Sequence, residues 1–62
     1  MYNYDILVKL TGGSVYNFNN EDGSLCVVGD VIKFSRTAHN YENALKSIKS
    51  TLNFCNVKYE IL

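Results

Sequence analysis

The chain has 62 residues, and its six lysine and arginine residues balance six aspartate and glutamate residues. This balance argues against a general nucleic-acid binder, which needs a basic surface, and equally against a strongly acidic mimic of DNA. A chain this short forms one domain, residues 1–62, that buries only about 60% of the surface its unfolded form exposes. We therefore expect one small core, for which association with a second copy is a common remedy.

The first residues, MYNYDILVKL, contain an acidic residue in an alternating pattern, which predicts a strand rather than a signal peptide. No apolar run approaches the roughly 20 residues of a membrane span, so no membrane contact is expected. Cys26 and Cys55 are then most simply reduced thiols of a cytoplasmic protein. The chain lacks proline and tryptophan and is rich in Asn, Tyr, Lys and Ile, a bias typical of AT-rich genomes, including those of many bacteriophages. For a phage protein, the expected location is the host cytoplasm.

Every second residue from Tyr4 to Leu10 is apolar, which predicts a first strand with one apolar face. Residues 11–14, Thr-Gly-Gly-Ser, then predict a turn. A three-residue, glycine-bulged loop is favoured over a two-residue loop because it pairs Val8 with Phe18 on the apolar face.

Two further turn signals, Asp22-Gly23 and Gly29-Asp30, separate predicted strands at residues 15–21, 24–28 and 31–35. The registers set by the three turns agree in placing the apolar residues on one face of a four-stranded meander. These residues are Tyr4, Ile6, Val8, Leu10, Tyr16, Phe18, Leu25, Val27, Ile32 and Phe34.

The segment from Asn40 to Asn53 predicts an amphipathic helix, with Tyr41, Ala44, Leu45, Ile48 and Leu52 on its apolar arc. Asn40 is the expected N-cap, with Thr37 as an alternative one turn earlier. Asn53 is expected to end the helix in a left-handed conformation, with Phe54 folded back on Ile48.

Alternation at Val57, Tyr59 and Ile61 predicts a last strand. A helical crossover after the meander places this strand antiparallel to the first strand, at its free edge. The predicted fold is therefore α+β with element order ββββαβ and sheet order 5-1-2-3-4, with the helix on one face.

Residues capable of catalysis are few and scattered. His39 is the only histidine, and its simplest interpretation is an exposed or capping residue. Cys26 is expected on the face of its strand away from the helix, and Cys55 in the loop after the helix. No Cys/His spacing matches a zinc site, and no lysine follows Gly12-Gly13 as a phosphate loop requires. We predict a non-enzyme without catalytic, metal or cofactor-binding residues.

The predicted open face of the sheet is more informative, because apolar residues interrupt its polar pattern. It is either a surface of no consequence or a contact surface with a polar rim. Residues 31–35 also form a predicted edge strand with only one charge, which is either a short edge guarded by Lys33 or an edge that another strand could extend. The candidate partner-binding residues are Leu7, Lys9, Val15, Val28, Val31, Lys33, Lys58 and Leu62.

The segment from Phe34 to Ile61, with its strand, NYENALKSI helix and closing VKYEI strand, is similar to the strand–helix–strand half of small phage proteins. One such family is the T7-type inhibitor of host RNA polymerase. The similarity rests on a general amphipathic pattern over less than half of the chain, so no residue role is transferred from it.

Three functions remain open from the sequence. The favoured one is a small interaction protein, encoded by a phage or mobile element, that binds and inhibits or modulates a larger host protein. A second is nucleic-acid binding through Lys9, Lys33 and Lys58 with tyrosines as stacking platforms, which the balanced charge disfavours. A third is a homodimer whose sheet faces or edges meet.

Overall fold

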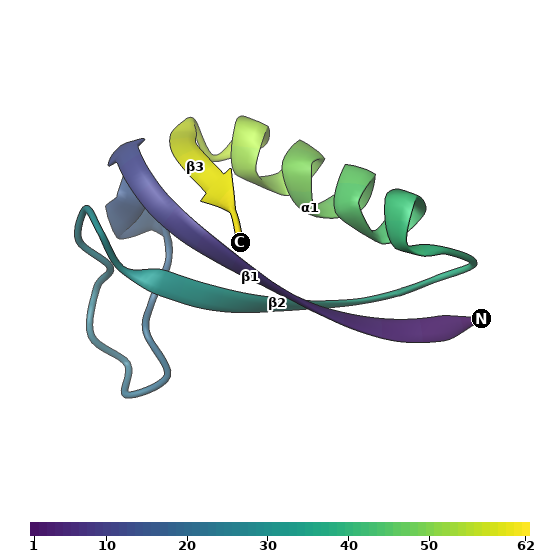
Figure 1. Ribbon diagram of the computed structural model, residues 1–62. Coiled ribbons are helices and arrows are strands. Elements are labelled where there is room, and N and C mark those ends of the chain that lie inside the picture. Colours follow the sequence, from purple (N-terminus) through teal and green to yellow (C-terminus); the bar gives the residue numbers. More distant parts are fainter.

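The computed structural model describes residues 1–62 and contains one sheet of three antiparallel strands with a helix across one face (Figure 1). The central strand is β1 (Tyr2–Gly13), which lies between β2 (Val31–Ala38) and β3 (Val57–Ile61) in the order β2-β1-β3. The helix α1 (Tyr41–Phe54) connects β2 to β3. The protein therefore has an α+β fold.

The predicted four-stranded meander with sheet order 5-1-2-3-4 is wrong. Residues 14–30, which we call the excursion, contain a 3-10 helix (Val15–Asn17) and a loop with a single isolated bridge between Asn19 and Leu25. The predicted fourth strand pairs directly with β1, with Ile6 opposite Phe34. The last strand is antiparallel to the first, as predicted, and takes the other edge of β1.

Backbone bonds of Leu10 explain why the chain returns to β1. Its N–H donates to the carbonyl of Asp30 at 2.9 Å, and its carbonyl accepts the N–H of Gly29 at 2.7 Å. Gly29 has φ +99°, the left-handed conformation that suits a glycine at a bulge. A turn does form, but its central residues are Val28 and Gly29, one residue earlier than predicted, with the N–H of Asp30 donating to the carbonyl of Val27 at 3.1 Å. It directs the chain onto the first strand instead of onto a third.

The excursion inverts the predicted pattern of buried and exposed residues. Tyr16, Leu25 and Val27, predicted to face the core, are each 61% exposed. Val15 and Cys26, predicted on the open face, are buried with 6% and 2% of their surface exposed. The reason is that the 3-10 helix breaks the pleat that would have carried the alternation of β1 into a second strand.

The predicted turn at Gly12-Gly13 is also wrong, because β1 runs through both glycines and pairs with β3. A register shift lies between Leu10 and Gly12, and Gly13 then pairs with Val57. Gly13 has φ +76°, and a Cβ atom there would lie 2.5 Å from the carbonyl oxygen of Asn56. A glycine is required here because two backbones approach each other closely.

The core lies between α1 and the covered face of the sheet. Nine residues are buried: Ile6, Val8, Leu10, Val15, Cys26, Ala44, Ile48, Leu52 and Val57. Phe18 closes one side of this core, since its ring packs edge-to-face against Phe34 with centroids 5.7 Å apart. The excursion therefore supplies core residues even though it is not part of the sheet.

The helix begins as predicted and ends later than predicted. The side-chain oxygen of Asn40 accepts the N–H of Asn43 at 2.9 Å, which confirms the N-cap. The left-handed residue is Asn56, with φ 59°, and not Asn53. Phe54 is 91% exposed and does not fold back on Ile48, because the helix continues through Phe54 and carries its side chain outward.

We expect Ile48→Ala to reduce the free energy of unfolding by about 2–5 kcal/mol, because Ile48 is fully buried and its truncation leaves a cavity. Denaturant unfolding monitored by circular dichroism measures this change. Lys49→Ala, on the exposed side of α1, is the matched control and should stay within about 0.5 kcal/mol of the unmodified protein. Equal effects of the two substitutions would contradict this packing.

We expect Gly13→Ala to destabilise the protein more than Gly23→Ala does. Both glycines have positive φ, +76° and +86°, so an alanine at either site is strained by about 1–2 kcal/mol. Only at Gly13 does the added Cβ also meet backbone, which raises the expected cost by about 1–3 kcal/mol. The midpoints of thermal unfolding of the two variants give the comparison, and a smaller loss for Gly13→Ala would contradict it.

Candidate functional site

The face of the sheet opposite α1 is exposed to solvent. Alternation along the three strands and the C-terminal residue gives it Asn3, Asp5, Leu7, Lys9, Val31, Lys33, Ser35, Thr37, Lys58, Glu60 and Leu62. Six of the eight candidate partner-binding residues are in this set: Leu7, Lys9, Val31, Lys33, Lys58 and Leu62. The other two lie elsewhere, since Val15 is in the core and Val28, although 62% exposed, is on the excursion.

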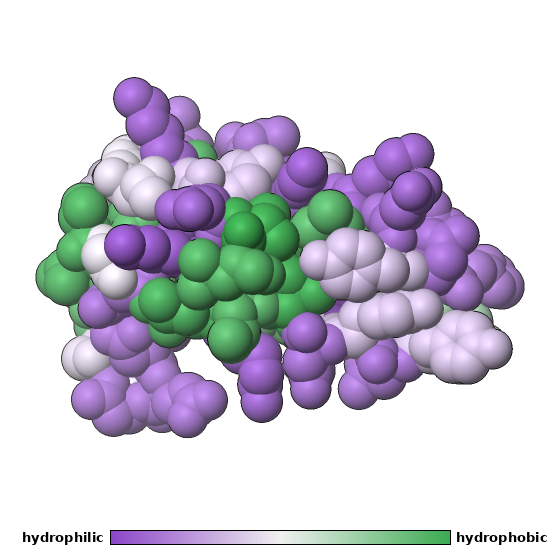
Figure 2. Space-filling view, viewed as in Figure 1, coloured by the Kyte–Doolittle hydropathy of each residue, from purple (hydrophilic) through white to green (hydrophobic).

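An apolar patch occupies the centre of this open face. Leu7 lies opposite Lys33 on β2, and on its other side its carbonyl accepts the N–H of Leu62 at 3.0 Å. Val31 lies two residues before Lys33 on β2, opposite Lys9. Leu7, Val31 and Leu62, which we call the sheet patch, are 49%, 47% and 59% exposed. Figure 2 shows the molecule from the side, with α1 along the top as in Figure 1, and hydrophobic side chains gather around the C-terminus below α1, between bands of hydrophilic ones.

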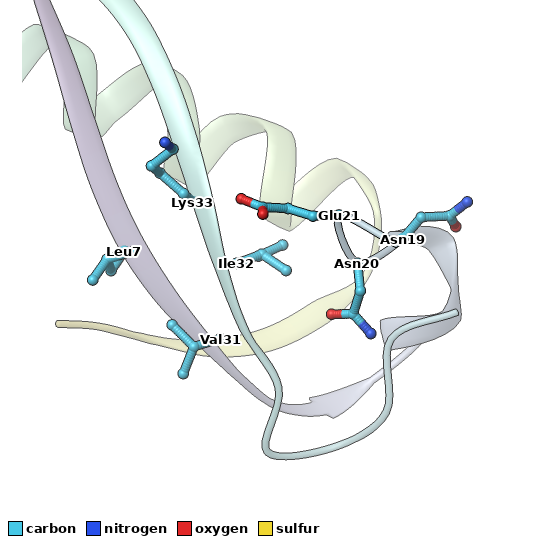
Figure 3. A pocket seen from close by; sticks show the side chains of 7 residues that line it. All are labelled: Leu7, Asn19, Asn20, Glu21, Val31, Ile32 and Lys33. Carbon is cyan, nitrogen blue, oxygen red and sulfur yellow. The ribbon is translucent and has the colours of Figure 1, made fainter. Parts of the chain in front are cut away.

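A groove of about 300 Å³ runs beside the sheet patch, between β2 and the excursion (Figure 3). We call it the edge groove; its lining residues are Leu7, Asn19, Asn20, Glu21, Val31, Ile32 and Lys33. In Figure 3, Leu7 and Val31 point to one side of β2, whereas Ile32 points to the other side, toward Asn20 and Glu21. The groove therefore wraps around the free edge of β2 from the open face to the excursion.

The sequence did not predict this groove. Its wall consists of Asn19, Asn20 and Glu21, which local patterns assign to a strand and a turn. A turn does form here, but its central residues are Glu21 and Asp22, one residue before the predicted Asp22-Gly23, with the N–H of Gly23 donating to the carbonyl of Asn20 at 2.9 Å. No signal in the sequence could show that this turn lies beside β2, because the contact depends on the path of the whole excursion.

Hydrogen bonds from Asn20 and Asp30 hold the groove wall in place. The Asp30 carboxylate accepts the N–H of Val27 at 3.0 Å and the side-chain amide of Asn20 at 3.1 Å. These bonds, the backbone one first, lower the pKa of Asp30 because they stabilise the ionised carboxylate. The oxygen of the Asn20 side chain in turn accepts the thiol of Cys26 at 3.5 Å. One asparagine thus connects the wall to the core and to the start of β2.

The backbone of β2 has a free edge, and its odd-numbered residues face it. Leu10 bonds to Asp30, so the alternation of an antiparallel ladder places the β1-directed groups of β2 at even-numbered residues. The N–H and carbonyl groups of Val31, Lys33, Ser35 and Thr37 are therefore directed away from β1. These are the groups that an added strand would bond.

Arg36 covers part of this free edge. Its Nη1 donates to the carbonyl of Ser35 at 2.9 Å, and its guanidinium lies 5.6 Å from the centroid of the Phe34 ring. Weaker bonds to the hydroxyls of Ser47 and Thr51, at 3.3 and 3.4 Å, anchor the same group on α1. The ladder is consequently occupied at Ser35 and open at Val31 and Lys33.

The cysteines and the histidine lie on different segments: Cys26 is on the excursion, His39 precedes α1 and Cys55 follows it. Burial, and to a lesser extent the charge of Asp30, raises the pKa of the Cys26 thiol, which keeps it protonated and unreactive. His39 is exposed, and Cys55 is a partly buried free thiol. No three His, Cys, Asp or Glu side chains lie together as a possible metal site.

Comparison with known proteins gives no relative. No protein-family model matches the chain, and neither a curated protein nor a solved structure matches it. The one helix is too short and too polar to span a membrane. A function for this chain is therefore inferred from its own surfaces.

We expect the excursion to loosen in acid. The folded state lowers the pKa of Asp30, so its carboxylate contributes stability above the unfolded value of about 3.9 that is lost as pH falls through the folded pKa. A pH titration by NMR should show the Val27 amide shifting below about pH 4. In Asp30→Asn that titration should disappear. If the chemical shift of the Val27 amide in the unmodified protein stays constant from pH 6 to the lowest pH at which the protein remains folded, the hydrogen bond between Val27 and Asp30 is contradicted.

Proposed function

We propose that the protein is a small non-enzymatic binding module that holds a larger protein against the open face of its sheet. The observation that supports this most directly is the sheet patch, in which Leu7, Val31 and Leu62 are about half exposed at the centre of a face that no other element covers. Protein interfaces commonly have such an apolar centre inside a polar rim.

Charged residues around the sheet patch fit the role of a rim. Lys9 lies opposite Glu60 in the register of β1 and β3, Lys33 lies opposite Leu7, and Lys58 lies opposite Gly12 near the end of β1. Asp5 accepts the hydroxyl of Ser35 at 2.6 Å. A rim with both signs of charge orients a partner and selects against wrong partners, and contributes less to raw affinity.

A module without a reactive cluster acts on its partner by occupying a surface. Inhibition or modulation of the bound protein is therefore the role that follows from the proposal. The Asn-, Tyr-, Lys- and Ile-rich composition is the reason to propose a phage- or mobile-element-encoded chain with a host protein as its target.

Nucleic-acid binding has less support as an alternative. It requires lysines and stacking aromatic rings on the same face. Lys9, Lys33 and Lys58 are on the open face, whereas the alternation of β1 and β3 puts Tyr4 and Tyr59 on the face covered by α1. Self-association through the sheet patch is the other alternative, and light scattering at high micromolar concentration distinguishes it by mass.

We expect Leu7→Asp to reduce capture of a partner from bacterial lysate at least tenfold, which corresponds to a loss of about 1.4 kcal/mol, because it places a charge in the centre of the contact. Quantitative mass spectrometry of the captured proteins measures the change. The thermal midpoint should shift little, since the residue is 49% exposed.

Lys46→Asp, on the exposed side of α1, is the matched control and should capture as much partner as the unmodified chain. Equal capture by Leu7→Asp would contradict the proposal. Loss of folding by Leu7→Asp would instead place Leu7 in the core and contradict the assignment of the open face.

A further inference from the structure

The edge groove combines an unpaired stretch of backbone with two kinds of side-chain environment. Val31 and Lys33 present free ladder groups, and the capped carbonyl of Ser35 marks where the open stretch ends. Leu7 and Val31 make one side of the groove apolar, while Glu21 makes the other side acidic. Backbone groups of this kind are bonded in peptide complexes by an added strand.

The carboxylate of Glu21 makes none of the hydrogen bonds that hold the excursion together. The side-chain bonds of that segment involve Asn20, Asp22, Ser24 and Asp30, and none involves Glu21. Its carboxylate nevertheless points across the groove toward β2 (Figure 3). A negative charge without a partner beside an open ladder favours a cationic group in the occupant.

We propose that the edge groove binds a short extended segment of the partner protein, which adds to β2 by pairing with Val31 and Lys33. This inference rests on the proposed function and specifies the form of the partner. An antiparallel segment exchanges two backbone bonds with each of these residues. The sheet thereby gains a fourth strand at the only part of the β2 edge that adjoins a groove.

Side chains alternate between the two faces of a strand, so the surroundings of each position determine which type of side chain the segment carries there. Its residue opposite Val31 lies on the open face beside the Val31 side chain, at the apolar side of the groove, and is apolar. Its residue opposite Lys33 lies on the same face and is acidic. The residue between them, opposite Ile32, points toward the excursion and is basic, so that it meets Glu21. The recognised segment has the order acidic, basic, apolar when it runs antiparallel to β2.

A labelled peptide with the sequence Thr-Thr-Glu-Lys-Val-Thr-Thr is the probe, and fluorescence anisotropy with the full chain measures its binding. N-methylation of the glutamate or valine amide should weaken binding at least tenfold, because each amide donates to β2. N-methylation of the lysine amide, which points away from β2, should change it less than threefold. Absence of binding at millimolar peptide, or equal effects of the three methylations, would overturn the proposal.

The proposed pairing of Glu21 with the lysine of the peptide is tested by exchanging the two charges. Glu21→Lys should weaken the probe at least fivefold, and a peptide with glutamate in place of its lysine should recover most of that loss on this variant. A control substitution, Glu42→Lys on the exposed surface of α1, should leave both affinities unchanged. Loss of affinity by Glu21→Lys without recovery by the exchanged peptide would overturn the assigned pairing.

The proposal for the edge groove and the proposal for the open face can be tested independently. Leu62 belongs to the sheet patch but does not line the groove, whereas Glu21 lines the groove but lies off the open face. Leu62→Asp should therefore reduce capture of the lysate partner and leave the probe peptide bound. If a lysate protein is captured but the probe peptide does not bind, only the proposal for the edge groove is overturned. If the peptide binds but no protein is captured, only the proposal for the open face is overturned.

Discussion

The two-sided pairing of β1 is the constraint on which the rest of the structure depends. Even-numbered positions of β1 bond on the β2 side, as Leu10 does with Asp30 just before β2, whereas Leu7 bonds on the β3 side. With both sides of its backbone committed, β1 has no edge left for another strand. Residues 14–30 therefore cannot add a strand beside β1, and they contribute to the core through side chains such as Cys26 and Phe18.

Patterns that lie within one contiguous segment predicted the structure best. The first strand, the Asn40 cap and the antiparallel last strand all follow from such patterns. The excursion could not be predicted in this way, because its apolar run around Cys26 fits either parity of a strand. Gly13 gives the same signal for a turn as for a close backbone approach, and its neighbour Asn56 is far away along the chain.

The residues of the candidate site also differ in whether a local pattern could predict their positions. Most of the open face was predictable because the parity of a strand decides which side chains share a face, whichever strand lies beside it. Val15 and Val28 were placed wrongly because they belong to the excursion, where that parity does not hold. The edge groove depends on the packing of the excursion beside β2, so no periodicity of the sequence contains it.

Edge strands of small sheets need protection from unwanted pairing, and β2 receives it unevenly. Arg36 occupies the carbonyl of Ser35, and the guanidinium is itself held on α1, so this part of the edge is covered by the chain's own side chain. Val31 and Lys33 lack such a cap and lie beside a groove. The edge of β2 can thus be protected against general aggregation and still accept one short segment. In the proposed groove, a strand fits only where its side chains suit both Glu21 and the sheet patch. The same geometry joins the two proposed contacts, since Leu7 and Val31 belong to both the patch and the groove.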